Sequence, residues 1–177
     1  ERAGLLSAVM RLVVMKAPRK MTTLAIVFAG IMSNTAAELG YVVLIPLSAI
    51  IFHSLGRHPL AGIAAAFAGV SGGYSANLLL GTIDPLLSGI TQQAARIIDP
   101  SYIVGAEANW YFMFVSTFLI TFLGYIITEK IVEPQLGPYN GNELDDEETD
   151  LKNAAQVTPL EKKALWAATG TFIVMAI

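Results

Sequence analysis

A short polar sequence interrupts an otherwise apolar stretch at residues 33–38, which read SNTAAE. The hydroxyl groups of Ser33 and Thr35, the Asn34 amide and any freed backbone carbonyls are oxygen ligands of the kind that suits sodium. Inside a membrane such a non-helical segment is tolerated only where it is buried or lines a cavity. We therefore expect a substrate or ion site here, with sodium near Asn34 and Thr35. The alternative is a polar turn between two ordinary helices, capped by Ser33 or Thr35.

Two acidic residues could titrate with the coupling ion, Na⁺ or H⁺, or orient a polar substrate. Glu38 is the only ionisable residue between Lys20 and His53, and an ionisable group at membrane depth is costly unless it serves a site. A capping role is the alternative for Glu38. Asp84 precedes Pro85, and the residues alone favour an Asp-Pro turn at the membrane surface over a functional carboxylate.

A run of small residues at 69–77, GVSGGYSAN, weakens the helix that it interrupts. An unwound segment here would expose backbone carbonyls beside Ser71, Ser75 and Asn77, which makes Ser71 and Asn77 candidate binding residues. The alternative is a tight helix crossing, since small residues let membrane helices approach closely.

Several classes of function are excluded or disfavoured. The chain has no cysteine, which excludes disulfide scaffolds and thiol nucleophiles. His53 and His58 are five residues apart without a nearby carboxylate, so no metal site is expected there. Hydrolase motifs are absent, and the basic residues form no stripe that would bind nucleic acid. We expect neither an enzyme nor a cofactor beyond the coupling ion.

The elements that must position these residues are membrane helices. Of 177 residues, 54% are hydrophobic and 14% are charged, against about 25% charged in an average soluble domain. Residues 60–80 and 108–128 are each long enough, at ~31 Å as a helix, to cross a hydrocarbon core of ~30 Å. Trp110 and Tyr111 lie where an interfacial aromatic belt would be.

The first apolar stretches favour a re-entrant hairpin. Residues 21–32 would rise only ~18 Å as a helix, whereas 21–55 as one helix would rise ~53 Å and overshoot the core. Basic residues precede the first arm and follow the second, which places both mouths in the cytoplasm.

Charge and apolar runs divide the chain into seven expected segments: an amphipathic entry segment (1–20), the hairpin (21–56, tip 33–38), a broken transmembrane helix (57–83), a connection with the external loop (84–107), a transmembrane helix (108–128), an acidic cytoplasmic loop (129–163) and the start of a truncated span (164–177). The chain begins without methionine and ends inside an apolar run. We therefore expect a fragment of an inverted-repeat secondary transporter, an all-α integral membrane protein with transmembrane helices and a re-entrant helical hairpin.

Six motifs in order resemble the aminobenzoyl-glutamate transporter (AbgT) family, over about residues 1–137. They are IMSNTAAELGYVVLIP (31–46), GRHPLAG (56–62), GVSGGYSANLLL (69–80), GTIDPLL (81–87), NWYFM (109–113) and TEKIVEP (128–134). The likeness is greatest to members that carry the same Ser-Asn-Thr hairpin.

The resemblance implies a multi-pass homodimer in the bacterial inner membrane, with two re-entrant hairpins of which one is present here. Some members are described as exporting sulfonamides and p-aminobenzoate, and another imports p-aminobenzoyl-glutamate, so the implied substrates are aromatic carboxylates or sulfonamides moved with an ion gradient. The aspartate of the GTIDP motif, Asp84 here, is regarded as important for transport, which reverses the preference for a surface turn. A sodium-coupled dicarboxylate carrier, a scaffold and a channel remain alternatives.

Overall fold

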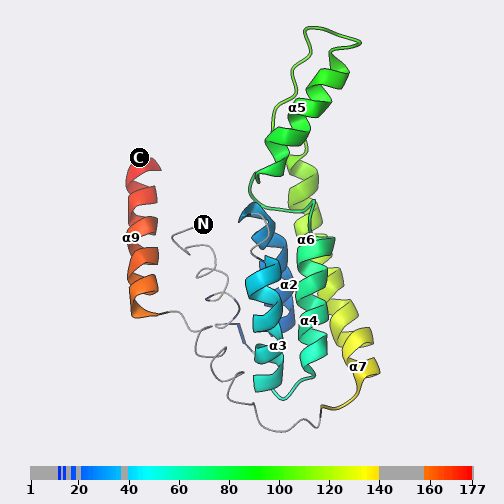
Figure 1. The fold of residues 1–177 in the computed structure, drawn as a ribbon, viewed down its shortest axis with the longest axis vertical. Coiled ribbons are helices and arrows are strands. Elements are labelled where there is room, and N and C mark those ends of the chain that lie inside the picture. Colours follow the sequence, from blue (N-terminus) through cyan, green and yellow to red (C-terminus); the bar gives the residue numbers. More distant parts are fainter. Residues whose placement is uncertain are drawn as a thin grey trace.

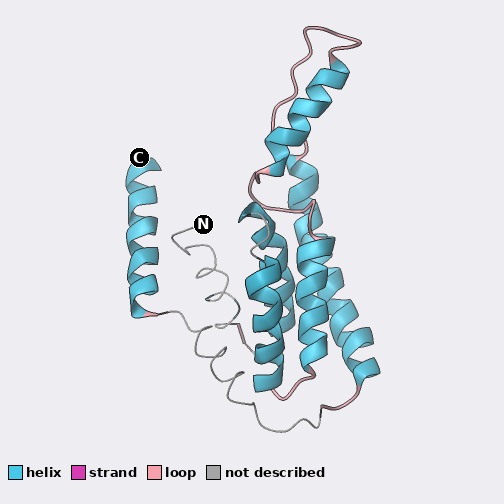
Figure 2. Cartoon of the chain, in the orientation of Figure 1, coloured by secondary structure: helices cyan, strands magenta, loops and turns pink. Residues whose placement is uncertain are grey.

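The computed structural model describes residues 12, 14, 17–18, 21–36, 40–139 and 158–176. Within these ranges every regular element is helical and no strand occurs (Figure 2). The α-helices are α2 (Thr22–Ser33), α3 (Ile45–Ser54), α4 (Pro59–Phe67), α5 (Ile83–Ala95), α6 (Trp110–Ile127), α7 (Glu133–Leu136) and α9 (Pro159–Ala176). Most of the entry segment expected at 1–20, Glu38 and the acidic run at 143–150 lie outside the described residues.

The two arms of the predicted hairpin correspond to α2 and to a helix that runs from Gly40 to Ser54, and we call residues 33–36 between them the hairpin tip. A 3₁₀ turn (Asn34–Ala36) follows α2, and a π-helical turn (Gly40–Leu44) leads into α3. Pro46 lies just after this π-helical turn, inside the 40–54 helix, and because it lacks an N–H it cannot donate to a carbonyl of the preceding turn. Neither arm alone reaches the length of about 20 residues that a span requires.

The third apolar stretch forms a shorter helix than its hydropathy predicts. Helix α4 continues through a π-helical turn (Ala68–Gly72), and the chain then leaves helical geometry before α5 begins at Ile83. The glycines at 69, 72 and 73 explain why the helix ends here, because glycine loses more conformational entropy in a helix than other residues do. The interruption that the glycine run at 69–77 predicted is therefore observed, whereas α5 lies in the segment for which the sequence predicted only a connection.

The fourth stretch forms the longest helix described. Helix α6, a π-helical turn (Thr128–Val132) and α7 run on from Trp110 to Leu136, 27 residues in all, and it is the one described helix long and apolar enough to cross a membrane. It ends at Gly137, whose φ of +73° is a left-handed conformation that glycine adopts without strain. The helix thus extends eight residues beyond the span predicted at 108–128.

Helix α2 packs against α4, the π-helical turn after it, and α6, while α3 packs against α4 (Figure 1). A Cβ placed on Gly30 would lie 2.9 Å from the Gly69 carbonyl carbon, and one on Gly69 would lie 2.6 Å from the Val27 oxygen. These distances are too short for any side chain, so α2 and the π-helical turn touch through their backbones. Helix α5 projects from one end of this bundle, and α9 stands apart from it (Figure 1).

Candidate functional site: a polar junction between the hairpin tip and the helix break

The Asn34 side chain binds the backbone at the end of the α4 helix. Its Nδ2 donates to the carbonyl oxygens of Val70 at 3.1 Å and Gly73 at 3.2 Å. Regular helical geometry ends here, and the Gly73 oxygen also accepts the Ala76 N–H at 3.0 Å. The Asn34 amide adds a second donor to this helix end and joins the hairpin tip to the break.

Thr35 and Asn77 join the same two segments a second time. Thr35 Oγ1 donates to Asn77 Oδ1 at 3.1 Å, and Asn77 Nδ2 lies 2.8 Å from Thr35 Oγ1. Asn77 is 4% exposed, and its Oδ1 also accepts the Leu79 N–H at 3.2 Å. Since a buried amide is costly unless it is paired, these contacts fix the Asn77 side chain.

Asp84 lies in the first turn of α5, where the helix N-terminus favours a negative charge. Its Oδ2 accepts the Gly81 N–H at 2.5 Å. Gly81 in turn lies against the hairpin tip, since a Cβ built on it would be 3.7 Å from the Asn34 carbonyl oxygen. The carboxylate is therefore held beside Asn34 by a short turn rather than standing free at a surface.

Two neighbouring cavities share Asp84, Leu87 and Asn109. The inner cavity, about 80 Å³, is also lined by Asn34 and Asn77. The outer cavity, about 380 Å³, lies between α5 and the return segment 104–109. Asn34, Asn77 and Asp84, three of the residues singled out in the sequence, thus line one small cavity, and Thr35 is bonded to Asn77.

The remaining candidates lie elsewhere. Ser33 is fully buried and donates to the Gly30 carbonyl oxygen at 2.6 Å. Ser71 pairs with the Tyr41 hydroxyl at 2.8 Å and lines neither of the two cavities. Glu38 lies outside the described residues. The run at 69–77 has features of both alternatives. Gly69 makes a tight helix crossing, and the carbonyl oxygens of Val70 and Gly73 accept hydrogen bonds from Asn34.

No set of three or more His, Cys, Asp or Glu side chains converges on a metal-sized space within the described ranges. His53 and His58 instead each meet the Tyr139 ring edge-on, with ring centroids 5.2 Å apart. The residues that line the inner cavity and carry side-chain oxygens include Asn34, Ser75 and Asp84, and oxygen is the ligand type that suits sodium. Sodium coordination near Asn34 and Thr35 stays a prediction.

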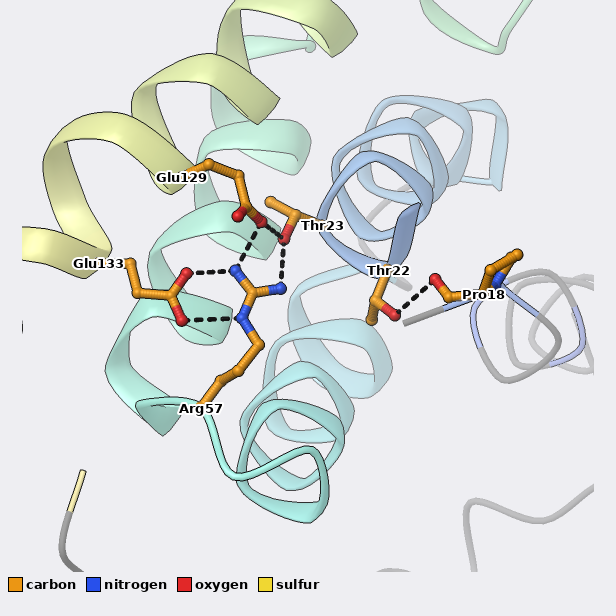
Figure 3. Close-up of polar contacts among 6 residues, drawn as sticks. All are labelled: Pro18, Thr22, Thr23, Arg57, Glu129 and Glu133. Carbon is orange, nitrogen blue, oxygen red and sulfur yellow. Dashed lines mark hydrogen bonds and ion pairs between the residues drawn. The ribbon is translucent and has the colours of Figure 1, made fainter. Parts of the chain in front are cut away.

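A second polar cluster lies at the other end of α2, and sequence reasoning missed it (Figure 3). Arg57, in the loop between α3 and α4, donates from Nε to Glu133 at 2.8 Å and from Nη2 to both Glu133 and Glu129. Its Nη1 donates to Thr23 Oγ1 at 2.9 Å, and Thr23 donates to Glu129 at 2.5 Å. The cluster ties the start of α2 to the end of the long helix.

Burial and charge act in opposite directions on Arg57. Desolvation disfavours the charged guanidinium, but its hydrogen bonds to Glu133 and Glu129 and their negative charges outweigh it and raise the pKa of Arg57 above its usual value. The Phe52 ring centroid lies 4.1 Å from the guanidinium carbon and adds a cation–π contact. Arg57 therefore stays charged at every physiological pH. The spacing of four between Glu129 and Glu133, which puts both on one helix face, was the available signal.

Comparison with known proteins places this geometry in a family. The entire chain, residues 1–177, matches the AbgT transporter family. The chain belongs to that family. This confirms the resemblance drawn from the sequence motifs. The homologues in this family are transporters rather than enzymes.

Three AbgT relatives extend the comparison. The p-aminobenzoyl-glutamate transport protein of Escherichia coli (strain K12) is 42% identical over 142 residues, 80% of this chain and 28% of the relative. The structure of MtrF from Neisseria gonorrhoeae, described as illuminating a class of antimetabolite efflux pumps, matches with 68% identity and a TM-score of 0.90, over 99% of this chain and 35% of MtrF. The YdaH transporter of Alcanivorax borkumensis, described as having an unusual topology, matches with 43% identity and a TM-score of 0.77, over 82% and 31%. The chain spans about a third of the length of these relatives.

Proposed function

We propose that the protein containing this chain is a secondary active transporter that exports sulfonamide antimetabolites and p-aminobenzoate, driven by an ion gradient. The efflux description of MtrF, which is 68% identical over nearly the whole chain, supports this direction of transport. The polar junction built by Asn34, Thr35, Asn77 and Asp84 is the part of the substrate and ion path that this chain contributes.

The observation that carries the proposal is the convergence of Asn34, Asn77 and Asp84 on one cavity. They come from three segments, the hairpin tip, the helix break and the start of α5, that the fold brings to one place. Discontinuous helices that meet at a polar cavity are typical of secondary transporters, in which helix ends and freed carbonyls bind substrate and coupling ion. A helix-packing scaffold has no need of a carboxylate beside such a cavity.

The architecture proposed for the whole protein follows the family. The two arms, α2 and Gly40–Ser54, form a re-entrant hairpin whose tip is the polar junction, and an inverted repeat supplies a second such hairpin. The protein is a homodimer in the bacterial inner membrane. Asp84 takes up or releases the coupling ion, Na⁺ or H⁺, as the site alternates between the two sides.

Transport by the full-length protein in proteoliposomes tests the proposal. Labelled p-aminobenzoate and sulfamethazine should move against their gradients when a Na⁺ or H⁺ gradient is imposed, and an ionophore should abolish the movement. Asp84→Asn should lower the rate at least about tenfold, as expected when an ionisable group in a transport path loses its charge. Equal transport by Asp84→Asn would remove the role given to this carboxylate, and downhill movement alone would favour a channel.

A second candidate is uptake of p-aminobenzoyl-glutamate. The 42% identity to the Escherichia coli transport protein favours it. A competition experiment distinguishes the two candidate substrates. Excess p-aminobenzoyl-glutamate should strongly block the transport of labelled p-aminobenzoate only if p-aminobenzoyl-glutamate is itself a substrate. Succinate should not compete with either compound. Competition by succinate would favour a dicarboxylate carrier instead.

A further inference from the structure

We infer that the outer cavity, between α5 and the segment 104–109, is a binding site for the aryl-amine end of the substrate. It is lined by Asp84, Leu87, Ser88, Thr91, Asn109 and the small residues and valine of 104–108. The inference deepens the proposed function, from which it takes the substrate class, and it assigns one end of the substrate to one set of side chains.

Three of the four polar side chains of this cavity, Asp84, Ser88 and Thr91, offer acceptors, and only the Asn109 amide also carries donors. Ser88 Oγ donates its proton to the Pro85 carbonyl oxygen at 3.0 Å, and Thr91 Oγ1 donates to the Leu87 carbonyl oxygen at 2.8 Å. Each hydroxyl has one proton, so both present only lone pairs to a ligand. The Asp84 carboxylate also accepts only. A ligand group that donates two hydrogen bonds, such as an amine on a ring, complements these side chains better than a carboxylate does.

Charge around the cavity points the same way. The Glu107 carboxylate lies against Gly105, since a Cβ built there would be 2.1 Å from Glu107 Oε1. No lysine, arginine or histidine lines the cavity within the described residues. The nearest base along the helix, Arg96, donates instead to the Tyr102 carbonyl oxygen at 3.3 Å. An anionic end of the substrate would meet repulsion here, so it must lie elsewhere.

Size and the position of Asn109 complete the geometry. A volume of about 380 Å³ lies at the small end of the range of about 300–1,000 Å³ for ligand pockets, and suits a single substituted ring. Leu87 and Val104 supply apolar surface for the ring faces. Asn109 lines both cavities, and its side chain makes no capping bond to α6. Its free amide can therefore contact the substrate ring as the ring moves from the outer cavity into the inner cavity, which Asn34 and Asn77 line.

Calorimetric titration of the purified full-length protein with four probes tests this inference. Sulfanilamide is paired with benzenesulfonamide, and p-aminobenzoate with benzoate, because the members of each pair differ only in the ring amine. The amine-bearing member should bind about tenfold more tightly, the effect of a hydrogen bond to a charged group. Ser88→Ala should reduce this preference by about threefold, as should Asn109→Leu.

Ser54→Ala is the matched control. Ser54 also donates to the carbonyl oxygen three residues earlier, at 2.8 Å, but at the opposite end of the bundle. It should keep the full amine preference. Equal affinities within both pairs for the wild type would overturn the inference, as would loss of the preference in Ser54→Ala together with Ser88→Ala.

Transport by the same preparation in proteoliposomes separates this result from the proposed function. Concentrative transport without an amine preference would leave the proposed function standing and end the inference. An amine preference without transport would support the binding site and overturn the proposed function.

Discussion

Thr35 and Asn77 are 42 residues apart in the chain, and each serves the other's side chain as donor and acceptor. The pair joins the end of α2 to the segment after the helix break, where Asn77 lines the inner cavity. Because Asn77 also accepts the Leu79 N–H, the pair fixes the backbone of the segment that leads to Asp84. The position of the carboxylate therefore depends on the hairpin tip.

A double-mutant cycle on this pair should show strong coupling. Thr35→Val and Asn77→Leu should each lower the free energy of unfolding by about 1–3 kcal/mol, because each leaves a polar partner unsatisfied, Asn77 being buried and Thr35 half-buried. The double variant should cost less than the sum by about 1 kcal/mol or more, since it removes both partners. Thermal unfolding of the full-length protein in detergent, with chemical denaturation as a second probe, measures the three values.

Thr169→Val provides the control for the cycle. Thr169 is exposed on α9 and donates only to the Leu165 carbonyl oxygen of its own helix. It should change stability by less than about 0.5 kcal/mol and should add independently to either variant. Simple additivity of Thr35→Val and Asn77→Leu would show that the reciprocal bonds contribute nothing.

The crossing between α2 and the π-helical turn predicts opposite behaviour for two glycines of the same turn. Gly69→Ala should destabilise by about 1–3 kcal/mol, since its methyl group would lie 2.6 Å from the Val27 carbonyl oxygen and force two backbones apart. Gly72→Ala meets nothing within 4 Å and should be neutral or slightly stabilising. Apparent melting temperatures of the two variants provide the comparison, and equal values would contradict the close approach.

Hydropathy predicted the helical class, because apolar runs of this length have no other stable form in a bilayer. Hydropathy alone would extend a helix over 60–80, but the glycines at 69, 72 and 73 correctly predicted that this helix is interrupted. Hydropathy missed α5, whose polar residues, such as Gln92 and Gln93, lower its mean hydropathy. Element types were therefore easier to predict than element ends.

The candidate site was predictable residue by residue but not as a set. Asn34, Asn77 and Asp84 are conspicuous as polar residues beside apolar stretches, yet only the fold shows that they line one cavity and that Ser71 does not. Asn109 gave no signal, because an asparagine before an aromatic pair is an ordinary end of a membrane helix. Arg57 is one of the basic residues that follow the second arm and indicate the cytoplasmic side, but its pairing with Glu129 and Glu133 was not predicted, although these two share a helix face.

Arg57 should be more costly to remove alone than together with its partners. Arg57→Gln leaves the Glu129 and Glu133 carboxylates, 28% and 25% exposed, facing one another without a cation. We expect a loss of about 2 kcal/mol, below the value of about 3–5 kcal/mol for fully buried pairs. The triple variant, with Glu129→Gln and Glu133→Gln added, should recover at least half of the loss. A triple variant less stable than Arg57→Gln would contradict this account, and thermal unfolding measures both.

Thr23 and Thr22 test whether the Arg57 cluster fixes α2. The two threonines are adjacent, 0% and 2% exposed, but they point to different partners (Figure 3). Thr23 joins Arg57 and Glu129, whereas Thr22 donates only to the Pro18 carbonyl oxygen at 3.3 Å, four residues earlier. Valine keeps the shape and β-branching of threonine and removes only the hydroxyl group.

Thr23→Val should therefore destabilise the full-length protein by about 1 kcal/mol more than Thr22→Val, because two charged partners each lose a hydrogen bond. Thr23→Val should also disturb the polar junction, because α2 is a single helix and Asn34 and Thr35 directly follow its other end. In proteoliposomes, Thr23→Val should raise the KM for p-aminobenzoate, while Thr22→Val should leave it within about twofold of the wild type. Equal melting temperatures and equal KM values for the two variants would show that the cluster does not position the hairpin arm.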